Sequence, residues 1–290
     1  MLTGVATAVV SSAVVAAVVG ALSSFVTQRY LLVRKAQIDA EAMERKALLD
    51  YQSLARQRLL DSIGPLRMQL LFGARDAVHR INSHGMSERG WNMDIGEHYA
   101  RTTIYRILRP LAVAQLIERM MGVADFTVDE DAVGLLRFGT AAERMLSSGE
   151  VVMDHPRADW ARQTQHLFRD NLRSAAARLI VDGQDRPKVL GYEEFKTEIP
   201  DPLRDDDVAA LAELLRGCRL RMTENPIFWL RLVGYAYACR ELIREQGVRI
   251  SFSVPTLSPA DLLRKVSDEH ILLHVDDYVL AMQSVVEEGL

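Results

Sequence analysis

The sequence lacks the short motifs that mark common catalytic and nucleotide-binding sites. It contains no Walker loop, no GxGxxG following a strand-like segment, no GxSxG elbow and no CxxC pair. These absences remove the direct sequence indications of a P-loop nucleotide hydrolase, a dinucleotide-dependent enzyme, a serine hydrolase and a dithiol redox protein. The sequence therefore predicts no cofactor, and it favours a role in binding over a role in catalysis.

The sequence also has few cysteines and a small net charge. The two cysteines, Cys218 and Cys239, lie far apart, and we expect reduced, buried thiols, which agrees with a cytoplasmic location. The net charge of -4 at pH 7 argues against nucleic acid as the main ligand. Basic residues outnumber acidic ones from Arg29 to Arg80, whereas Tyr192 to Asp207 is acidic. This distribution suits a cytoplasmic protein standing on an anionic membrane leaflet.

Charged residues are absent from Val5 to Thr27, an apolar segment close to the start of the sequence. A membrane-spanning helix needs about 20 predominantly apolar residues to cross a hydrocarbon core of ~30 Å. The segment therefore predicts a single transmembrane helix. A cleaved secretory signal is one alternative, but the residues before Val5 carry no basic side chain, which such a signal requires. A buried hairpin helix is a second alternative.

The residues that flank this segment predict its orientation. The first basic residues of the chain are Arg29, Arg34 and Lys35, all on its carboxyl side. Basic residues beside a membrane span favour the cytoplasmic face. We therefore expect a single-pass protein of the cell membrane, held in the lipid bilayer through residues 5–27, with its amino terminus outside and its remaining residues in the cytoplasm.

Small residues recur at every fourth position of the same segment. Such a surface allows two membrane-spanning helices to approach closely, so it predicts a homo-oligomer. The alternative is that a segment rich in Val, Ala and Ser produces this spacing by chance. The residues assigned to this self-association surface are Ala8, Ser12, Ala16, Gly20 and Ser24.

The predicted fold class is all-α, with three regions. Residues 1–27 form the anchor. Residues 28–63 contain neither Gly nor Pro and are rich in helix-forming residues, which predicts a long juxtamembrane helix or stalk that ends at Gly64-Pro65. Residues 64–290 form a helical cytoplasmic domain. A polar segment broken by Gly and Pro near residues 182–202 marks a possible subdomain boundary.

Proline following a capping residue marks several predicted helix starts in this domain. They are Asp154-His155-Pro156, Asn225-Pro226 and Ser258-Pro259, the last opening a helical region that runs to about Glu288. The only convincing strand pattern is Val248 to Val254, which alternates and is β-branched. Because a lone strand has no evident partner, we expect an extended connector or a minor hairpin there, and the sequence predicts at most one minor strand or hairpin in the domain.

Two groups of residues are candidates for chemistry or binding. His270, His274 and Asp277 fall at positions i, i+4 and i+7, so one continuous helix would align two imidazoles and a carboxylate as metal ligands. The competing interpretation is that they are solvated residues beside an apolar face. Trp91 lies in an irregular, glycine-containing segment, where it could contact a partner or pack against the nearest helix.

Three functions are compatible with these features. The favoured one is a membrane-anchored helical scaffold or adaptor that recruits a protein partner, of unknown identity, to the membrane. The second is an effector that oligomerises and permeabilises the bilayer, although the anchor has no charged face to line a pore. The third is a metal-dependent hydrolase built on the two histidines and the aspartate named above.

Overall fold

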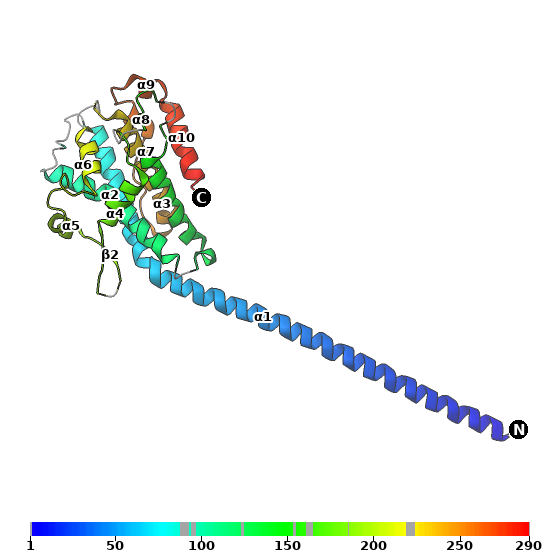
Figure 1. Ribbon diagram of the computed structural model, residues 1–290. Helices are drawn as coiled ribbons and strands as arrows, with labels where there is room; N and C mark the ends of the chain where they lie inside the picture. Colours follow the sequence, from blue (N-terminus) through cyan, green and yellow to red (C-terminus); the bar gives the residue numbers. More distant parts are fainter. Residues whose placement is uncertain are drawn as a thin grey trace. The chain divides into compact units, whose positions relative to one another are not determined.

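The computed structural model describes residues 2–87, 93, 97–122, 125–152, 155–160, 165–184, 186–218 and 224–289; the side chains of residues 2–14 and 16 are outside this set. The chain divides into two units, Met1–Ala55 and Arg56–Leu290. Both are helical, and the described residues include only a two-stranded sheet besides helices, turns and connecting segments (Figure 1). The predicted all-α fold class is confirmed at this level.

The first helix, α1 (Leu2–Met86), continues through Gly64-Pro65, so the predicted helix end at this dipeptide is wrong. Proline inside a helix removes a hydrogen bond and costs about 3 kcal/mol. Burial of the apolar side chains on both sides of Pro65 offsets this cost: Leu59, Ile63 and Leu70 are all buried in the core of the second unit. The local signal of Gly64-Pro65 is therefore overridden by packing.

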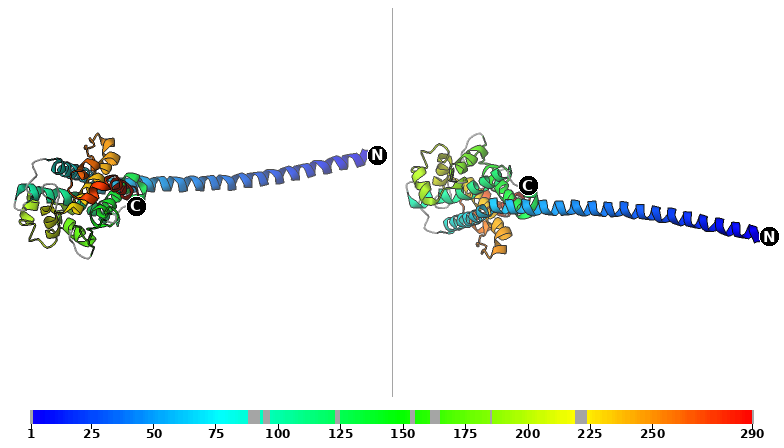
Figure 2. Two further views of the ribbon diagram at one scale, coloured as in Figure 1. Left: turned by 90° about the horizontal axis from the view of Figure 1, so that it is seen from above. Right: turned by 90° about the horizontal axis from the view of Figure 1, so that it is seen from below.

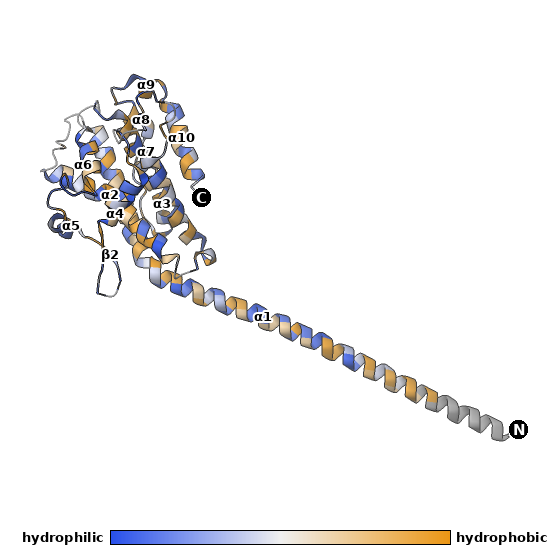
Figure 3. Ribbon diagram, viewed as in Figure 1, coloured by the Kyte–Doolittle hydropathy of each residue, from blue (hydrophilic) through white to orange (hydrophobic). Residues whose placement is uncertain are grey.

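No helix among the described residues is long and apolar enough to cross a membrane. Residues 5–14 and 16 of the predicted span Val5–Thr27 have side chains outside the described set, so the transmembrane assignment stays a prediction. In the described remainder of the first unit, every large hydrophobic side chain from Val15 to Leu54 is exposed. Figure 3 shows hydrophobic and hydrophilic residues along this part of α1.

The second unit is built around α7 (Pro226–Leu242), which is buried along nearly its whole length. Its most extensive packing is against α3 (Glu130–Ser147), and α2 (His98–Met120) and α10 (Val275–Glu287) contact α3 in turn (Figures 1 and 2). The start of α7 at Pro226 follows Asn225 as predicted. One apolar helix is therefore surrounded by amphipathic ones.

Two buried polar side chains of α7 join it to its neighbours. The Tyr235 hydroxyl donates to the Ile107 carbonyl of α2 at 2.9 Å. Arg231 Nη1 donates to the Ser148 carbonyl at 2.7 Å, just beyond the end of α3, where carbonyl groups lack helical partners. Burial lowers the pKa of Arg231 to about 10. Both side chains satisfy backbone groups inside the core.

Short elements complete the second unit. The helices are α4 (Arg169–Ala177), α5 (Tyr192–Glu198), α6 (Ala209–Arg216), α8 (Pro259–Leu263) and α9 (Glu269–Leu273), with the single turns η1 (Phe126–Val128), η3 (Ile243–Gly247) and η4 (Val248–Ile250). The strands β1 (Ile180–Val181) and β2 (Lys188–Val189) pair antiparallel. The residues of the possible subdomain boundary contribute to the common core: Leu190, Phe195 and Ile199 are buried in it.

Three local predictions are corrected. The segment Val248–Val254, expected to be an extended connector or a minor hairpin, begins as the 3-10 turn η4 and has no regular secondary structure from Phe252 on, and the hairpin lies instead at β1 and β2. No helix begins at His155-Pro156, which lie in a turn; the next helix among the residues that the structure describes is α4, from Arg169. The helical region after Ser258 is interrupted, forming α8, α9 and α10. In each case the local pattern is present, but the tertiary contacts of the segment select another conformation.

Candidate functional site

The structure brings the predicted metal ligands together, with the His270 and His274 rings 4.6 Å apart, but not on one continuous helix. Helix α9 ends at Leu273, and His274 has a non-helical backbone (φ -117°, ψ 28°) before α10 begins at Val275. His270 Nδ1 lies 3.0 Å from the Tyr278 hydroxyl, whereas His274 Nδ1 lies 3.1 Å from Asp277 Oδ2. Within the described part of the chain, no three His, Cys, Asp or Glu residues are arranged to hold a metal ion. The continuous helix on which the metal hypothesis depended is therefore not formed.

A buried pair that the sequence did not indicate lies beside these histidines. His155 Nε2 donates to Asp268 Oδ1 at 3.0 Å, and His155 Nδ1 accepts from the Arg157 backbone N–H at 3.1 Å. Asp268 also accepts from the Ile271 backbone N–H, so it caps α9, and from Arg157 Nη1. Each ring nitrogen of His155 has a partner and its side chain is fully buried. The pair therefore has a structural role.

The hydrogen bonds of this pair determine the charge of its carboxylate. Burial alone would raise the pKa of Asp268, but the hydrogen bonds from Ile271, His155 and Arg157 outweigh this effect and hold that pKa below its usual value. The pKa of His270 is lowered by desolvation and by the imidazoles of His155 and His274. An ionised carboxylate surrounded by donors is suited to fixing the start of α9.

The other predicted sites lie partly or wholly outside the described residues. Trp91 is outside them, as are the side chains of Ala8, Ser12 and Ala16. The remaining two members of the small-residue surface are exposed on α1. A Cβ atom at Gly20 would meet nothing within 4 Å, and Ser24 Oγ donates to the Ala21 carbonyl at 2.9 Å. The self-association surface stays a prediction.

The two cysteines are free and buried, as predicted. Burial raises the pKa of both thiols far above the ordinary value. Since the thiolate is the reactive form, Cys218 and Cys239 are not suited to nucleophilic catalysis.

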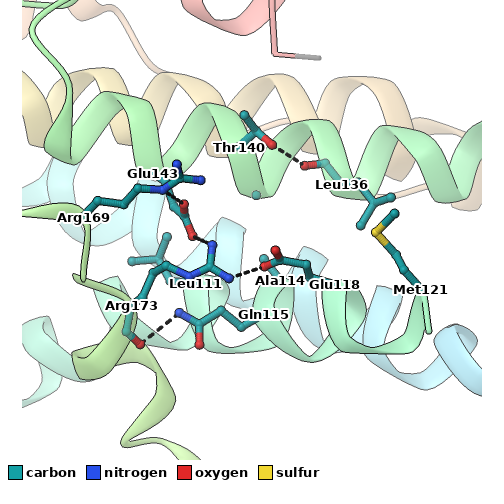
Figure 4. Close-up of a pocket in the computed structure, with 11 residues that line it drawn as sticks. Leu111, Ala114, Gln115, Glu118, Met121, Leu136, Thr140, Glu143, Arg169 and Arg173 are labelled. Atoms are coloured by element: carbon teal, nitrogen blue, oxygen red, sulfur yellow. Dashed lines mark hydrogen bonds and ion pairs between the residues drawn. The ribbon is translucent and has the colours of Figure 1, made fainter. Parts of the chain in front are cut away.

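A pocket of about 160 Å³ lies between α2, α3 and α4 (Figure 4). Small residues bring α2 and α3 close together at this point, since a Cβ atom at Gly139 would lie only 3.4 Å from that of Ala114. One side of the pocket is apolar and the other is charged. The lining residues are Leu111, Ala114, Gln115, Glu118, Met121, Leu136, Gly139, Thr140, Glu143, Arg169 and Arg173.

Two arginines of α4 point toward the buried carboxylate of Glu143 on α3 (Figure 4). Arg169 Nε donates to Glu143 Oε2 at 3.0 Å, and Arg173 Nη1 donates to Oε1 at 2.8 Å. Arg173 Nη2 also donates to Glu118 Oε2 of α2 at 2.6 Å. Burial acts to lower the pKa of Arg173, but its interactions with Glu118 and Glu143 outweigh burial and raise that pKa. The network is electrically balanced and joins the three helices.

The chemistry of this pocket favours binding over catalysis. Both oxygens of Glu143 accept hydrogen bonds from guanidinium groups, and the Thr140 hydroxyl is directed to the Leu136 carbonyl at 3.3 Å. Neither His nor Cys occurs among the described residues that line it. The apolar wall formed by Leu111, Leu136 and the exposed Met121 could accept an apolar side chain.

Comparison with protein families, curated proteins and solved structures finds no match for this chain. Its function is therefore inferred from its own residues.

The sequence alone did not reveal the pocket. Glu143, Arg169 and Arg173 are ordinary helix-surface residues by spacing. A charged residue at the border of an apolar helical face was the only available signal, and this signal is common. The partners come from helices separated along the chain, so only the fold identifies them.

Proposed function

We propose that this protein is a single-pass membrane-anchored helical adaptor. In this proposal, Val5–Thr27 lies in the bilayer, the amino terminus is outside the cell, and the unit Arg56–Leu290 recruits a protein partner at the cytoplasmic face. The small residues of the anchor support self-association of the chain.

One observation carries the proposal: the described part of the first unit exposes its hydrophobic side chains on a helix that is long and uninterrupted. Val15, Val19 and Leu22 are each more than half exposed, and no charged residue precedes Arg29. Exposed apolar surface costs about 25 cal/mol per Å², and large contiguous patches mark interaction with proteins or membranes. A hydrocarbon environment would remove this cost.

The pocket between α2, α3 and α4 supports a binding role for the second unit. Its charged groups are fully paired with each other, and its open wall is apolar. Such a site suits an apolar side chain of a partner protein, and the charged residues at its rim would orient that partner. The metal-dependent hydrolase considered from the sequence gains no comparable support, because His274 interrupts the helix it requires.

Membrane extraction tests the anchor. The full chain is expressed beside a variant lacking residues 5–27 and beside Leu22→Arg, which places a charge in the proposed span. We expect the full chain to resist extraction by alkaline carbonate and the deletion variant to be recovered in the soluble fraction. Leu22→Arg should be retained less well in the membrane, since a charged residue at the centre of a span raises the free energy of insertion by about 2.5–3.5 kcal/mol. Leu48→Arg, outside the span, is the matched control. Recovery of the full chain in the soluble fraction would refute the anchor.

Partner capture tests the adaptor. The full chain is cross-linked in native membranes and the captured proteins are compared with those of Met121→Glu, which puts a charge in the pocket wall. Leu273→Glu is the control, since this side chain is also exposed and does not line the pocket. We expect one partner to be lost only with Met121→Glu. Equal capture by all three proteins would remove the pocket from the proposal.

Dye leakage separates tethering from permeabilisation. Cells expressing the full chain are compared with cells in which an unrelated single-pass anchor replaces residues 5–27. An adaptor should retain partner capture with either anchor and cause no loss of membrane potential. Leakage that depends on the native anchor would favour the permeabilising effector instead.

A further inference from the structure

A second cavity, of about 430 Å³, lies within the second unit between α1, α2 and α5. It is separate from the pocket of Figure 4 and shares no lining residue with it. Helices α1 and α2 approach closely beside it: a Cβ atom at Gly73 would lie 3.3 Å from Pro110 Cγ. The residues that line the cavity are Gly73, Asp76, His98, Thr102, Tyr105, Arg106, Arg109 and Tyr192.

One face of α2 supplies most of the polar groups of this cavity. His98, Thr102, Arg106 and Arg109 are spaced by four, four and three residues, which places them above one another along a helix. Arg80 of α1 lies behind them, with Nη2 donating to the Thr102 hydroxyl at 2.9 Å. The cavity therefore has two arginines in its wall and a third beside it.

The positive charge of this cavity is not neutralised by its own carboxylate. Asp76 is the one acidic residue among the described lining residues, and it is shared between Arg109 at 3.9 Å and Arg75 at 3.7 Å. Arg106 forms no ion pair or hydrogen bond with any residue that the structure describes. Burial first, and then the charge of Arg106, lowers the pKa of Arg80, as expected for like charges in proximity.

Two aromatic side chains, Tyr105 of α2 and Tyr192 of α5, also line the cavity. The rings of Tyr105 and Tyr192 are 5.4 Å apart, and Tyr192 meets the His98 ring edge-on at 5.8 Å. The Tyr105 hydroxyl donates to the buried Leu190 carbonyl at 3.0 Å, which fixes its ring. The Tyr192 hydroxyl lies 3.4 Å from His98 Nδ1. Hydrogen-bond donors and an apolar ring surface therefore face the same space.

We propose that this cavity binds a phosphate monoester, with Arg106 and Arg109 on the phosphate oxygens and His98 as a further donor. Guanidinium groups match the oxygens of a phosphate group in geometry and charge. A monoester carries a charge of about -1.5 to -2 at pH 7, which the excess positive charge around Arg106 would balance. The tyrosine rings would contact the esterified group. This ligand could be a soluble metabolite or a lipid headgroup, since both present the same chemistry.

Calorimetric titration of the full chain in detergent, in phosphate-free buffer, tests the proposal. The probes are inorganic phosphate, glycerol 3-phosphate, adenosine 5′-monophosphate, and phosphatidylcholine vesicles with and without phosphatidic acid. Arg106→Gln removes the unpaired guanidinium, whereas Arg106→Lys keeps its charge without the planar fork. Arg137→Gln, an exposed arginine of α3 that does not line the cavity, is the control for net charge. Thermal unfolding of each variant establishes that it is folded.

We expect binding of a phosphate monoester to weaken by at least about tenfold in Arg106→Gln, by less in Arg106→Lys, and not at all in Arg137→Gln. Binding of soluble monoesters would assign a metabolite, and binding only of vesicles with phosphatidic acid would assign a lipid. Absence of binding to every probe would overturn the proposal. So would binding that Arg106→Gln leaves unchanged, because the cavity would then not be the site.

Discussion

The helix α1 contains two regions with the same secondary structure and opposite environments. Leu48 and Leu54, in the first unit, are each 56% exposed, whereas Leu59 and Leu70, in the second, are 0% exposed. Both regions are rich in helix-forming residues, so propensity does not distinguish them. The difference is that the second region has α2, α3 and α7 to pack against. Helix formation and core formation are therefore separate properties of this chain.

This comparison bears on how each region is stabilised. An isolated helix depends on its length and composition, because nucleation is unfavourable and elongation adds one hydrogen bond per residue. The second unit depends on apolar burial and on buried polar contacts such as the Glu143 network. Substitutions of one chemical type should therefore have different effects in the two regions.

The largest effect is expected from removing buried leucine. Leu70→Ala leaves a cavity in the core and should reduce the free energy of unfolding by about 2–5 kcal/mol. Leu48→Ala, in the exposed region, should change it by less than about 0.5 kcal/mol. Urea unfolding followed by tryptophan fluorescence, to which the buried Trp229 contributes, measures both. Equal losses would show that the first unit is packed in solution.

Removing the buried carboxylate of Asp268 should have a smaller effect on the free energy of unfolding. Asp268→Ala removes the acceptor for His155, Ile271 and Arg157, and should cost about 2 kcal/mol at pH 7. Asp50→Ala, on the exposed helix, should have no measurable effect. Urea unfolding of the two variants tests this prediction, and equal stability of Asp268→Ala and Asp50→Ala would contradict the structural role of Asp268.

The contribution of Asp268 should also depend on pH. Since its pKa is lower in the folded protein than in the unfolded chain, its stabilisation is fully present above the unfolded carboxyl pKa of about 3.9. It is lost as the pH falls through the lower folded value. The difference in stability between wild type and Asp268→Ala should therefore shrink below about pH 4. A constant difference down to pH 2 would contradict the lowered pKa.

The same distinction explains which parts of the fold the sequence could predict. The helix starts at Asn225-Pro226 and Ser258-Pro259 depend on local chemistry, and both are found: α7 begins at Pro226, although the Asn225 side chain does not cap it, and Ser258 accepts from the Asp261 backbone N–H at the start of α8. Gly64-Pro65 and His155-Pro156 carry equally strong local signals, yet tertiary packing determines their conformation. Local patterns were reliable only where the surrounding contacts agreed with them.

The candidate sites were less predictable for a related reason. The spacing of His270, His274 and Asp277 assumed one helix, and no sequence pattern indicated that His274 would separate α9 from α10. The Glu143 network and the arginines around Arg106 each combine residues from different helices. Their separation along the chain makes these groups invisible to motif searches.

The smallest effect concerns a glycine at the start of the buried region of α1. Apart from its chain neighbours, a Cβ atom at Gly64 would meet nothing within 4 Å, and the residue is helical, so Gly64→Ala should reduce the entropy of the unfolded chain. The ring of Pro65 opposes part of this gain, because it disfavours a helical backbone at a preceding residue that carries a Cβ. We expect a net stabilisation of less than about 0.5 kcal/mol, seen as a small rise in Tm. Gly234→Ala in α7 is the opposing control, because its Cβ atom would lie 2.8 Å from Met145 Sδ and should lower Tm. A fall in Tm for Gly64→Ala as large as that for Gly234→Ala would show that this side of α1 is covered, and would move the border between the exposed and buried regions toward the first unit.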